Sequence, residues 1–297
     1  MPVLLIATLV LGSMPTDSIV PAGAKVEKVV GGFLFTEGAI WTRKNTLIFS
    51  DIPANLMVEL TGTSWKTFRK PSDNANGNQL DASGNLYTAH HGSRSVTFTD
   101  MKTGDVKTLA AKFAGSRLNS PNDLVVDSKG IVYFTDPDYG VSKDKKELDF
   151  NGVYRITLGG RVEALIRDFK KPNGIGLSPD EKTLYVADTE ANHVRSFTVT
   201  PDGRLLNPKV FYSWTSPGAP TGPGAPDGLR LDKQGNVYAT GPGGVSIIRP
   251  DGTLIASIPV PEVPTNVAWG EADGKTLYIT AQTSIYRIKL NATGLRY

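Results

Sequence analysis

Residues Asn122–Phe134 read NDLVVDSKGIVYF, and this stretch contains the unit from which most of the chain is built. A polar residue opens it, alternating apolar residues follow, and the turn Asp127-Ser-Lys-Gly130 leads into a second short apolar segment with an aromatic centre. Apolar alternation with a period of two is typical of strands, and Asp and Gly are typical of tight turns. The stretch therefore predicts an antiparallel β-hairpin.

The same unit occurs six times, with starts 38 to 54 residues apart. The other five copies cover residues 37–49, 76–87, 173–186, 227–238 and 265–279. A third alternating segment follows each copy, at residues 55–60, 95–98, 152–156, 194–199, 245–248 and 284–289, and a fourth strand usually comes after it. Six units of about four strands predict an all-β, six-bladed β-propeller. A β-sandwich is the alternative, but it would not need six similar copies.

The two ends of the chain are expected to close the ring together. The sixth unit ends after its third strand, and the alternating segment Lys25–Val30 precedes the first unit. This segment can supply the missing outer strand and protect an open sheet edge. We therefore expect a single propeller domain over residues 25–297, closed by an N-terminal strand.

The N-terminal 24 residues have features of a secretory signal. Residues Pro2–Leu11 form an apolar run too short to span a membrane, and Ala22-Gly23-Ala24 offers a cleavage site, although no Lys or Arg precedes the run. A signal peptide over residues 1–24 would place the protein in the periplasm or outside the cell. The alternative is a flexible or packed N-terminal segment on a cytoplasmic protein. No membrane span is expected.

Composition excludes several classes of function. The chain has 297 residues, 39% of them hydrophobic, and carries a formal net charge of +3, with Lys and Arg scattered along it. A nucleic-acid partner is not expected, because such proteins gather basic residues into a patch or stripe. With no Cys, the chain has no disulfide, thiolate nucleophile or Cys-based zinc site.

The residues that open the first strand of each unit are expected to form a ring at one end of the propeller axis. All six carry a side-chain oxygen: Glu37, Asn76, Asn122, Asn173, Asp227 and Thr265. Asn, Asp and Thr are also ordinary turn residues, but that explanation does not account for Glu37 or for oxygen at all six positions. Carboxylate and amide oxygens are ligands of hard cations such as Ca²⁺, and two carboxylates balance a divalent charge. We call these six the ring residues.

A second tier is expected around the same end, because each second strand runs back antiparallel to the first. It contains Asp51, His90, His91, Asp136, Asp188, Gly241 and Gln282. Paired histidines are more often structural than catalytic. From this tier we select His91 and Asp136 as candidates for substrate contact, together with the ring residue Asn76.

Four sequence segments, in their order and spacing, resemble the gluconolactonase and regucalcin-type lactonase family. They are Phe35–Trp41 (FTEGAIW), Pro121–Leu124 (PNDL) with Tyr133–Gly140 (YFTDPDYG), Lys171–Gly174 (KPNG) with Tyr185–Thr189 (YVADT), and Pro226–Gly228 (PDG). The resemblance covers about residues 30–290. It implies a six-bladed propeller with one catalytic divalent ion, commonly Ca²⁺, whose ligands match Glu37, Asn122, Asn173 and Asp227. A fifth segment, Tyr87–Arg94 (YTAHHGSR), resembles a family stretch in which an acidic residue commonly stands at the position of His90. This departure leaves the substrate open.

The leading hypothesis is a metal-dependent lactonase that opens a small sugar lactone such as gluconolactone. In it, the ion polarises the carbonyl and activates a water, and Asp227 accepts the proton. Without Cys or a Gly-x-Ser-x-Gly motif, a covalent nucleophile is not favoured. A phosphotriesterase-like hydrolase and a non-catalytic, Ca²⁺-stabilised binding propeller remain alternatives. Zn²⁺, Mn²⁺ and Mg²⁺ remain open beside Ca²⁺, and the oligomeric state is not predicted.

Overall fold

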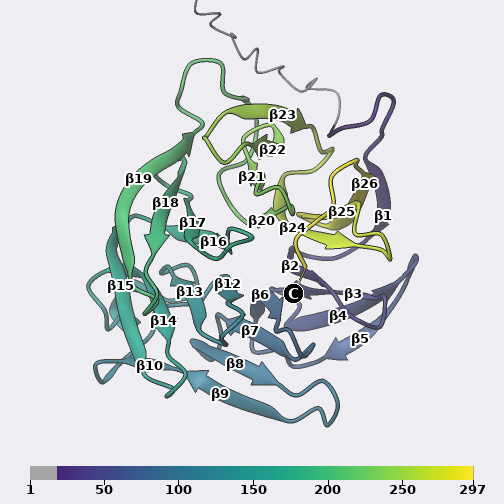
Figure 1. The fold of residues 1–297 in the computed structure, drawn as a ribbon. Coiled ribbons are helices and arrows are strands. Elements are labelled where there is room, and N and C mark those ends of the chain that lie inside the picture. Colours follow the sequence, from purple (N-terminus) through teal and green to yellow (C-terminus); the bar gives the residue numbers. More distant parts are fainter. Residues whose placement is uncertain (1–18, 297) are drawn as a thin grey trace, which may run out of the picture.

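Six four-stranded antiparallel sheets surround a central axis in the computed structural model, which describes residues 19–296 (Figure 1). Blade 1 contains β2 (Thr36–Trp41), β3 (Leu47–Asp51), β4 (Leu56–Thr61) and β5 (Ser64–Arg69). Blade 2 contains β6 (Ala75–Leu80), β7 (Leu86–His90), β8 (Ser95–Thr99) and β9 (Val106–Ala110). Blade 3 contains β12 (Leu124–Val126), β13 (Val132–Asp136), β14 (Asn151–Ile156) and β15 (Val162–Phe169).

The second half of the ring repeats this order. Blade 4 contains β16 (Pro172–Leu177), β17 (Thr183–Asp188), β18 (His193–Val199) and β19 (Leu205–Ser213). Blade 5 contains β20 (Leu229–Leu231), β21 (Val237–Gly241), β22 (Gly244–Ile248) and β23 (Leu254–Ile258). Blade 6 contains β24 (Pro264–Gly270), β25 (Thr276–Ala281), β26 (Ser284–Lys289) and β1 (Glu27–Gly31). The six-bladed propeller predicted from the repeats is confirmed.

The N-terminal strand closes the ring as predicted. β1 pairs antiparallel with β26, with Glu27 opposite Arg287 and Gly31 opposite Ser284. Glu262, on the loop before β24, accepts hydrogen bonds from the Ser284 hydroxyl at 2.6 Å and the Tyr286 hydroxyl at 2.9 Å. The first and last strands of the ring thus share one sheet, which gives β26 a partner on its outer edge.

The turns within the blades follow from Asp and Gly at fixed places. In the turn after β6, Asp81 Oδ1 accepts the backbone N–H groups of Ser83 at 2.8 Å and Asn85 at 2.9 Å. Gly84 has φ +86°, a left-handed conformation that suits glycine. The turn at Asp127–Gly130 repeats these bonds, and Gly130 has φ +92°. Local sequence therefore sets the hairpin register.

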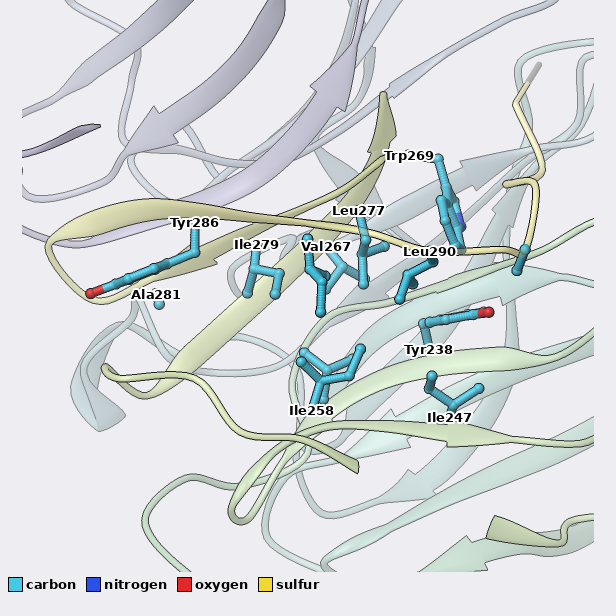
Figure 2. Packing of buried hydrophobic residues seen from close by; sticks show 13 residues of the cluster. Tyr238, Ile247, Ile258, Val267, Trp269, Leu277, Ile279, Ala281, Tyr286 and Leu290 are labelled. Atoms are coloured by element: carbon cyan, nitrogen blue, oxygen red, sulfur yellow. The ribbon is translucent and has the colours of Figure 1, made fainter. Parts of the chain in front are cut away.

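Apolar side chains fill the spaces between neighbouring blades. Figure 2 shows the interface of blades 5 and 6, where Tyr238, Ile247 and Ile258 meet Val267 and Trp269. The Tyr238 and Trp269 rings pack edge to face with centroids 4.8 Å apart. Because each blade packs against a neighbour on both faces, the second strands are apolar on both sides, as in β13, where Val132, Tyr133 and Phe134 are all buried.

Acidic residues at the ends of three second strands anchor the loops that lead into the innermost strands. Asp51 accepts the backbone N–H groups of Leu34 at 3.0 Å and Phe35 at 3.1 Å. Asp136 accepts those of Asn119 and Ser120, and Asp188 those of Lys170 and Lys171. Each of these three carboxylates therefore accepts two backbone N–H groups and fixes a loop.

Two short segments lie outside the six blades. β10 (Lys112–Phe113) and β11 (Ser116–Arg117) form a small hairpin, and the 3₁₀ turn η2 (Lys143–Lys145) lies in the loop between β13 and β14.

Most of the predicted signal peptide, residues 1–18, lies outside the described residues, whereas Ile19, Val20 and Ala24 pack against blade 6. Within residues 19–296, the structure contains no helix with the length and apolar character needed to cross a membrane.

The C-terminal segment lies across the axis at the end opposite to the ring residues (Figure 1). Leu295 N donates to the carbonyl of Leu231 at 3.0 Å, and Gly294 packs on the Trp269 ring. A cavity of about 40 Å³ remains beneath Leu295 and Arg296, enough for a few water molecules. It is separate from the candidate site described below.

Replacing Asp51 by Asn should lower the free energy of unfolding by about 1–3 kcal/mol. The amide offers one acceptor where two backbone N–H groups need partners, and its NH₂ group would face one of them. Chemical denaturation measures the effect. Asp251→Asn is the control, because Asp251 accepts the N–H of Thr253 at 2.8 Å on an exposed turn, and its change should stay within about 0.5 kcal/mol. Equal effects would show that Asp51 is no anchor.

Candidate active site

The ring residues lie together at one end of the axis, as the repeats predict. Glu37, Asn76, Asn173 and Thr265 lie near the starts of β2, β6, β16 and β24. Asn122 and Asp227 lie just before the short strands β12 and β20. Five of the six side chains are buried, and Asp227 is partly exposed. Asp227 is therefore the ring residue most accessible to solvent.

Glu37 and Asp227 face each other within hydrogen-bonding contact. Burial raises the pKa of Glu37 to about 7. Burial also raises the pKa of Asp227 well above its usual value, and repulsion from Glu37 and Asp123 adds to the effect. Two carboxylates so close repel each other when both are ionised, and a cation between them removes that repulsion.

The Glu37 carboxylate is held on one side only. Its Oε2 accepts the backbone N–H of Gly38 at 2.7 Å and Nδ2 of Asn266 at 3.1 Å. These two bonds use the lone pairs of Oε2. Oε1 is therefore the oxygen left for Asp227 or for an ion.

Asn122 and Asn173 each leave the amide oxygen of the side chain available to bind an ion. Asn173 Nδ2 donates to the Thr189 hydroxyl at 3.0 Å, and that hydroxyl donates to the carbonyl of Pro226 at 2.7 Å. This contact identifies which end of the Asn173 amide is nitrogen and leaves its Oδ1 available as an acceptor. The Asn122 side chain is 5% exposed and makes no hydrogen bond to any of residues 19–296. Both amides can supply an oxygen ligand.

Asn76 and His91 form a pair beside the ring. Asn76 Nδ2 lies 3.0 Å from Nε2 of His91, and Asn76 Oδ1 is buried without a partner in the described part of the chain. Burial lowers the pKa of His91 to about 4, so its imidazole is neutral at pH 7. Gly140 packs closely on the His91 side chain, because an added Cβ at position 140 would lie 2.9 Å from His91 Cβ. The structure therefore brings two of the three predicted substrate contacts together.

Asp136, the third predicted substrate contact, does not join this cluster. Its side chain is fully buried, and its two oxygens accept the N–H groups of Asn119 at 2.8 Å and Ser120 at 2.7 Å. Burial raises the pKa of Asp136 to about 7. The residue anchors a loop, and we assign it no substrate contact.

His90 and Thr265 are also committed to structural bonds. His90 bonds the carbonyl of Ser72 through Nδ1 at 2.9 Å and the hydroxyl of Thr97 through Nε2 at 2.8 Å. It occupies the loop-anchor position that Asp51 has in blade 1. Both ring nitrogens of His90 are therefore engaged within the fold. The Thr265 hydroxyl donates to the carbonyl of Thr36 at 2.7 Å, so the ring offers five oxygen-bearing side chains.

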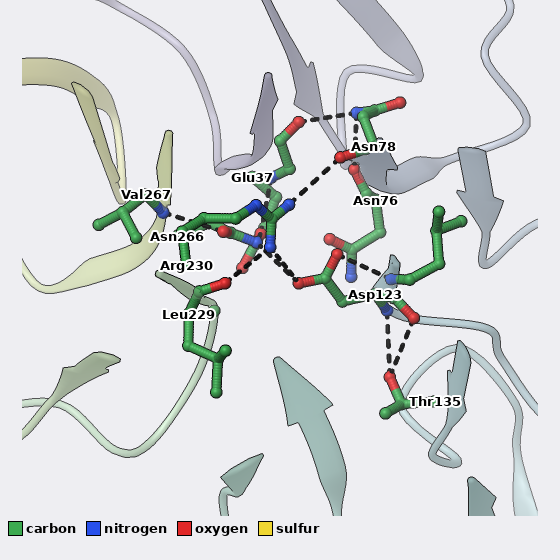
Figure 3. Close-up of polar contacts among 12 residues, drawn as sticks. Glu37, Asn76, Asn78, Asp123, Thr135, Leu229, Arg230, Asn266 and Val267 are labelled. Carbon is green, nitrogen blue, oxygen red and sulfur yellow. Dashed lines mark hydrogen bonds and ion pairs between the residues drawn. The ribbon is translucent and has the colours of Figure 1, made fainter. Parts of the chain in front are cut away.

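Sequence reasoning missed four residues near the site. Asp123 lies just before β12, and Arg230 and Asn266 lie on β20 and β24. Figure 3 shows Arg230 bonded to Asp123 and Asn266 bonded to Glu37. The half-exposed Tyr139 has its hydroxyl within reach of Thr189 and Asn173, and burial raises its pKa to about 12. The motif containing Tyr139 was visible in the sequence, but its position against the ring was not.

The donor chemistry fits a hard divalent cation. Glu37 and Asp227 supply carboxylates, and Asn122 and Asn173 supply amide oxygens, which are the ligand types of Ca²⁺. Nowhere in residues 19–296 do three or more His, Cys, Asp or Glu side chains converge as metal ligands. The amides are therefore essential members of any ion site here. An ester or lactone carbonyl could approach from the side of Asp227, which is partly exposed to solvent.

Known proteins resemble this chain in sequence and fold over most of its length. A gluconolactonase of Zymomonas mobilis is 32% identical, and the match covers 94% of this chain and 85% of that protein. The solved structure of a Xanthomonas campestris gluconolactonase is 29% identical, with a TM-score of 0.82 over 92% of this chain and 91% of that one. The calcium-binding protein regucalcin of Agrobacterium tumefaciens is 19% identical with a TM-score of 0.72, covers 89% of this chain and 92% of its own, and shares the fold.

The family model for the SMP-30/gluconolactonase/LRE-like region matches residues 35–283, a range that contains all six ring residues and every blade in whole or in part. Lactone hydrolysis is supported at the level of the family by these gluconolactonase relatives. The chain therefore belongs to the SMP-30/gluconolactonase/LRE-like family.

Proposed function

We propose that this lactone hydrolase opens sugar lactones such as gluconolactone at a divalent ion held by the ring. The observation that carries the proposal is the contact between Glu37 and Asp227, two carboxylates with raised pKa values, next to the available amides of Asn122 and Asn173. The gluconolactonase relatives support the substrate class.

Glu37, Asn122, Asn173 and Asp227 would hold the ion. Ca²⁺ is favoured because all four ligands are oxygens, and the likeness in fold to the calcium-binding regucalcin of Agrobacterium agrees with this choice. Zn²⁺ is less suited, because it prefers His and Cys ligands. Mg²⁺ and Mn²⁺ accept the same oxygen ligands.

A bound divalent ion supplies Lewis-acid polarisation of an ester carbonyl and lowers the pKa of a water molecule. Asp227 accepts a proton from the attacking water, since it is the one ring residue that is partly exposed to solvent. The water oxygen bonds to the carbonyl carbon, the ring C–O bond breaks, and the proton passes from Asp227 to the departing alkoxide. Asn173 hydrogen-bonds Asp227 and keeps its carboxylate in place.

Asn76 and His91 would orient the substrate. Their contact fixes the Asn76 amide, whose buried Oδ1 can accept a hydrogen bond from a sugar hydroxyl. The neutral His91 adds a polar group without adding a charge beside the ion, because burial keeps its pKa at about 4. Hydroxyl groups on the substrate would satisfy both side chains, and this favours a polyhydroxylated lactone over an apolar one.

Calorimetry after chelator treatment should detect about one Ca²⁺ per chain, bound more tightly at pH 8 than at pH 6. The pKa of Glu37 is about 7, so this carboxyl is mostly protonated at pH 6 and binding must then displace its proton. Above pH 7 the carboxylate is ionised and that cost disappears. Glu37→Gln should weaken binding by removing a charged ligand. Unchanged binding in this variant would exclude Glu37 from the ligand set.

Asp227→Asn should lower kcat by about 100-fold or more at saturating Ca²⁺. The amide keeps the shape and one oxygen ligand but loses the basicity, so Ca²⁺ affinity should fall only modestly. Steady-state kinetics and calorimetry on the same preparation separate the two effects. Retention of most of the turnover would place the base elsewhere, and His91 would be the next candidate.

A proton-release assay over aldonolactones, aryl esters and phosphotriesters, with and without added Ca²⁺, tests the function itself. We expect Ca²⁺-dependent turnover to be fastest with the polyhydroxylated lactones. Preference for phosphotriesters would favour a phosphotriesterase-like hydrolase. Ca²⁺ binding without turnover of any substrate would favour a binding propeller.

A further inference from the structure

The residue that follows each ring residue forms a second layer along the axis. In four units this residue is glycine, at positions 38, 77, 174 and 228. The two exceptions are Asp123, after Asn122, and Asn266, after Thr265. The repeat thus places only two side chains in a layer that is otherwise built from backbone.

The glycines make room for these two side chains. A Cβ at Gly77 would lie 2.5 Å from Asp123 Oδ1, and a Cβ at Gly228 would lie 2.2 Å from Asn266 Cγ. Neither distance is tolerated in a folded protein. Asp123 and Asn266 therefore fill the space over the neighbouring glycines and meet near the axis.

One layer further from the ring, Arg230 pairs with Asp123. The guanidinium Nη1 lies 3.2 Å from Asp123 Oδ2 and donates to the carbonyl of Leu229 at 2.8 Å, while Nη2 donates to the carbonyl of Asn78 at 3.2 Å. The side chains are 1% exposed for Asp123 and 11% exposed for Arg230. The equivalent positions in the other five units carry no charge: Ile40, Gln79, Val125, Gly176 and Ala268. This buried ion pair therefore joins blade 5, through Arg230, to the segment before β12 of blade 3, through Asp123.

Asn266 connects this ion pair to the ring. Its Oδ1 accepts the backbone N–H of Val267 at 2.9 Å, which fixes the orientation of the amide. Its Nδ2 then points at Glu37 Oε2, at 3.1 Å, and also lies 3.5 Å from Asp123 Oδ2 (Figure 3). The Asn266 amide can hold Glu37 in one rotamer. Rotation of the Glu37 side chain would break its bond to Nδ2, and rotation of the amide would break the bond between Oδ1 and Val267.

We propose that Asn266, supported by the Asp123–Arg230 pair, is a positioning residue that holds Glu37 ready to bind the divalent ion. With Oε2 of Glu37 engaged by Gly38 and Asn266, Oε1 is presented to the ion without further ordering. Groups that orient metal ligands in this way commonly contribute 10- to 100-fold to metal affinity. The inference rests on the proposed ion site and adds a residue that acts on the ion through Glu37.

The test is Ca²⁺ titration calorimetry of the chelator-treated full chain carrying Asn266→Leu, which keeps the branched shape of the side chain but cannot donate to Glu37. Ca²⁺ affinity should fall at least tenfold relative to the parent. Asn266→Ser, which is smaller and too short to reach Glu37, should show the same loss if Asn266→Leu does not fold. The control is Asn236→Leu, because Asn236 is also buried and bonds Asp232 at 2.8 Å outside the ring. Its Ca²⁺ affinity should change less than threefold at a comparable loss of melting temperature.

A double-mutant cycle separates positioning from general structure. If Asn266 acts through Glu37, Glu37→Gln combined with Asn266→Leu should bind Ca²⁺ no more weakly than Glu37→Gln alone. Independent, additive losses would overturn the proposal, as would parent-like Ca²⁺ affinity in both Asn266 variants. Failure of the parent chain itself to bind Ca²⁺ would instead remove the ion site, and with it this inference. The readout is binding, so it does not depend on which lactone the enzyme opens.

Discussion

The repulsion between the neighbouring carboxylates of Glu37 and Asp227 is the constraint around which the site is arranged. With Asp123 behind them, three carboxylates share the axis, and Arg230 is the cation paired with Asp123. When all are ionised, the four groups leave two negative charges, the charge that one divalent ion balances. Desolvation makes this imbalance costly, and it raises the pKa of both ring carboxylates. The protein tolerates the repulsion because the surrounding blades hold the carboxylates in place.

Repetition supplies the scaffold, and departures from it supply the chemistry. Each unit delivers one polar residue to the ring and usually one glycine behind it, so six similar hairpins build a symmetric opening. Asp123, Asn266 and Arg230 break that symmetry at three positions. They make one carboxylate of the ring different from the other, with Glu37 fixed through Asn266 and Asp227 left partly exposed. The two roles proposed for these carboxylates, ion ligand and general base, need such different surroundings.

The strand order, the ring and the closing strand could be predicted from the sequence, because each depends on local patterns. The sequence alone could not show which acidic residues bind loop backbone and which remain free as proposed ion ligands. Asp136 and Asp227 both stand at the ends of apolar segments, but Asp136 meets two backbone N–H groups of a loop sixteen and seventeen residues away. His90 shows the same limit, since its place in a family motif suggested a bearing on the substrate, whereas both of its ring nitrogens hold the fold. Only the three-dimensional path of the loops decides which side chains remain free. The glycine pattern behind the ring was readable in the sequence, yet its meaning depended on knowing that the exceptions meet at the axis.

The site also depends on closure of the ring. Glu37 belongs to blade 1 and Asn266 to blade 6, so their hydrogen bond spans the seam where the first and last blades meet. The Thr265 hydroxyl and the Thr36 carbonyl bridge the same seam at 2.7 Å. β1 holds blade 6 together from the outside, through its pairing with β26. A propeller opened at this seam would separate Glu37 from the amide that orients it, while the contacts among Asn173, Thr189 and Pro226 lie wholly within blades 4 and 5 and the loop between them. The proposed ion site therefore includes residues from both sides of the seam where the first and last blades meet, so the stability of this closure affects the position of Glu37.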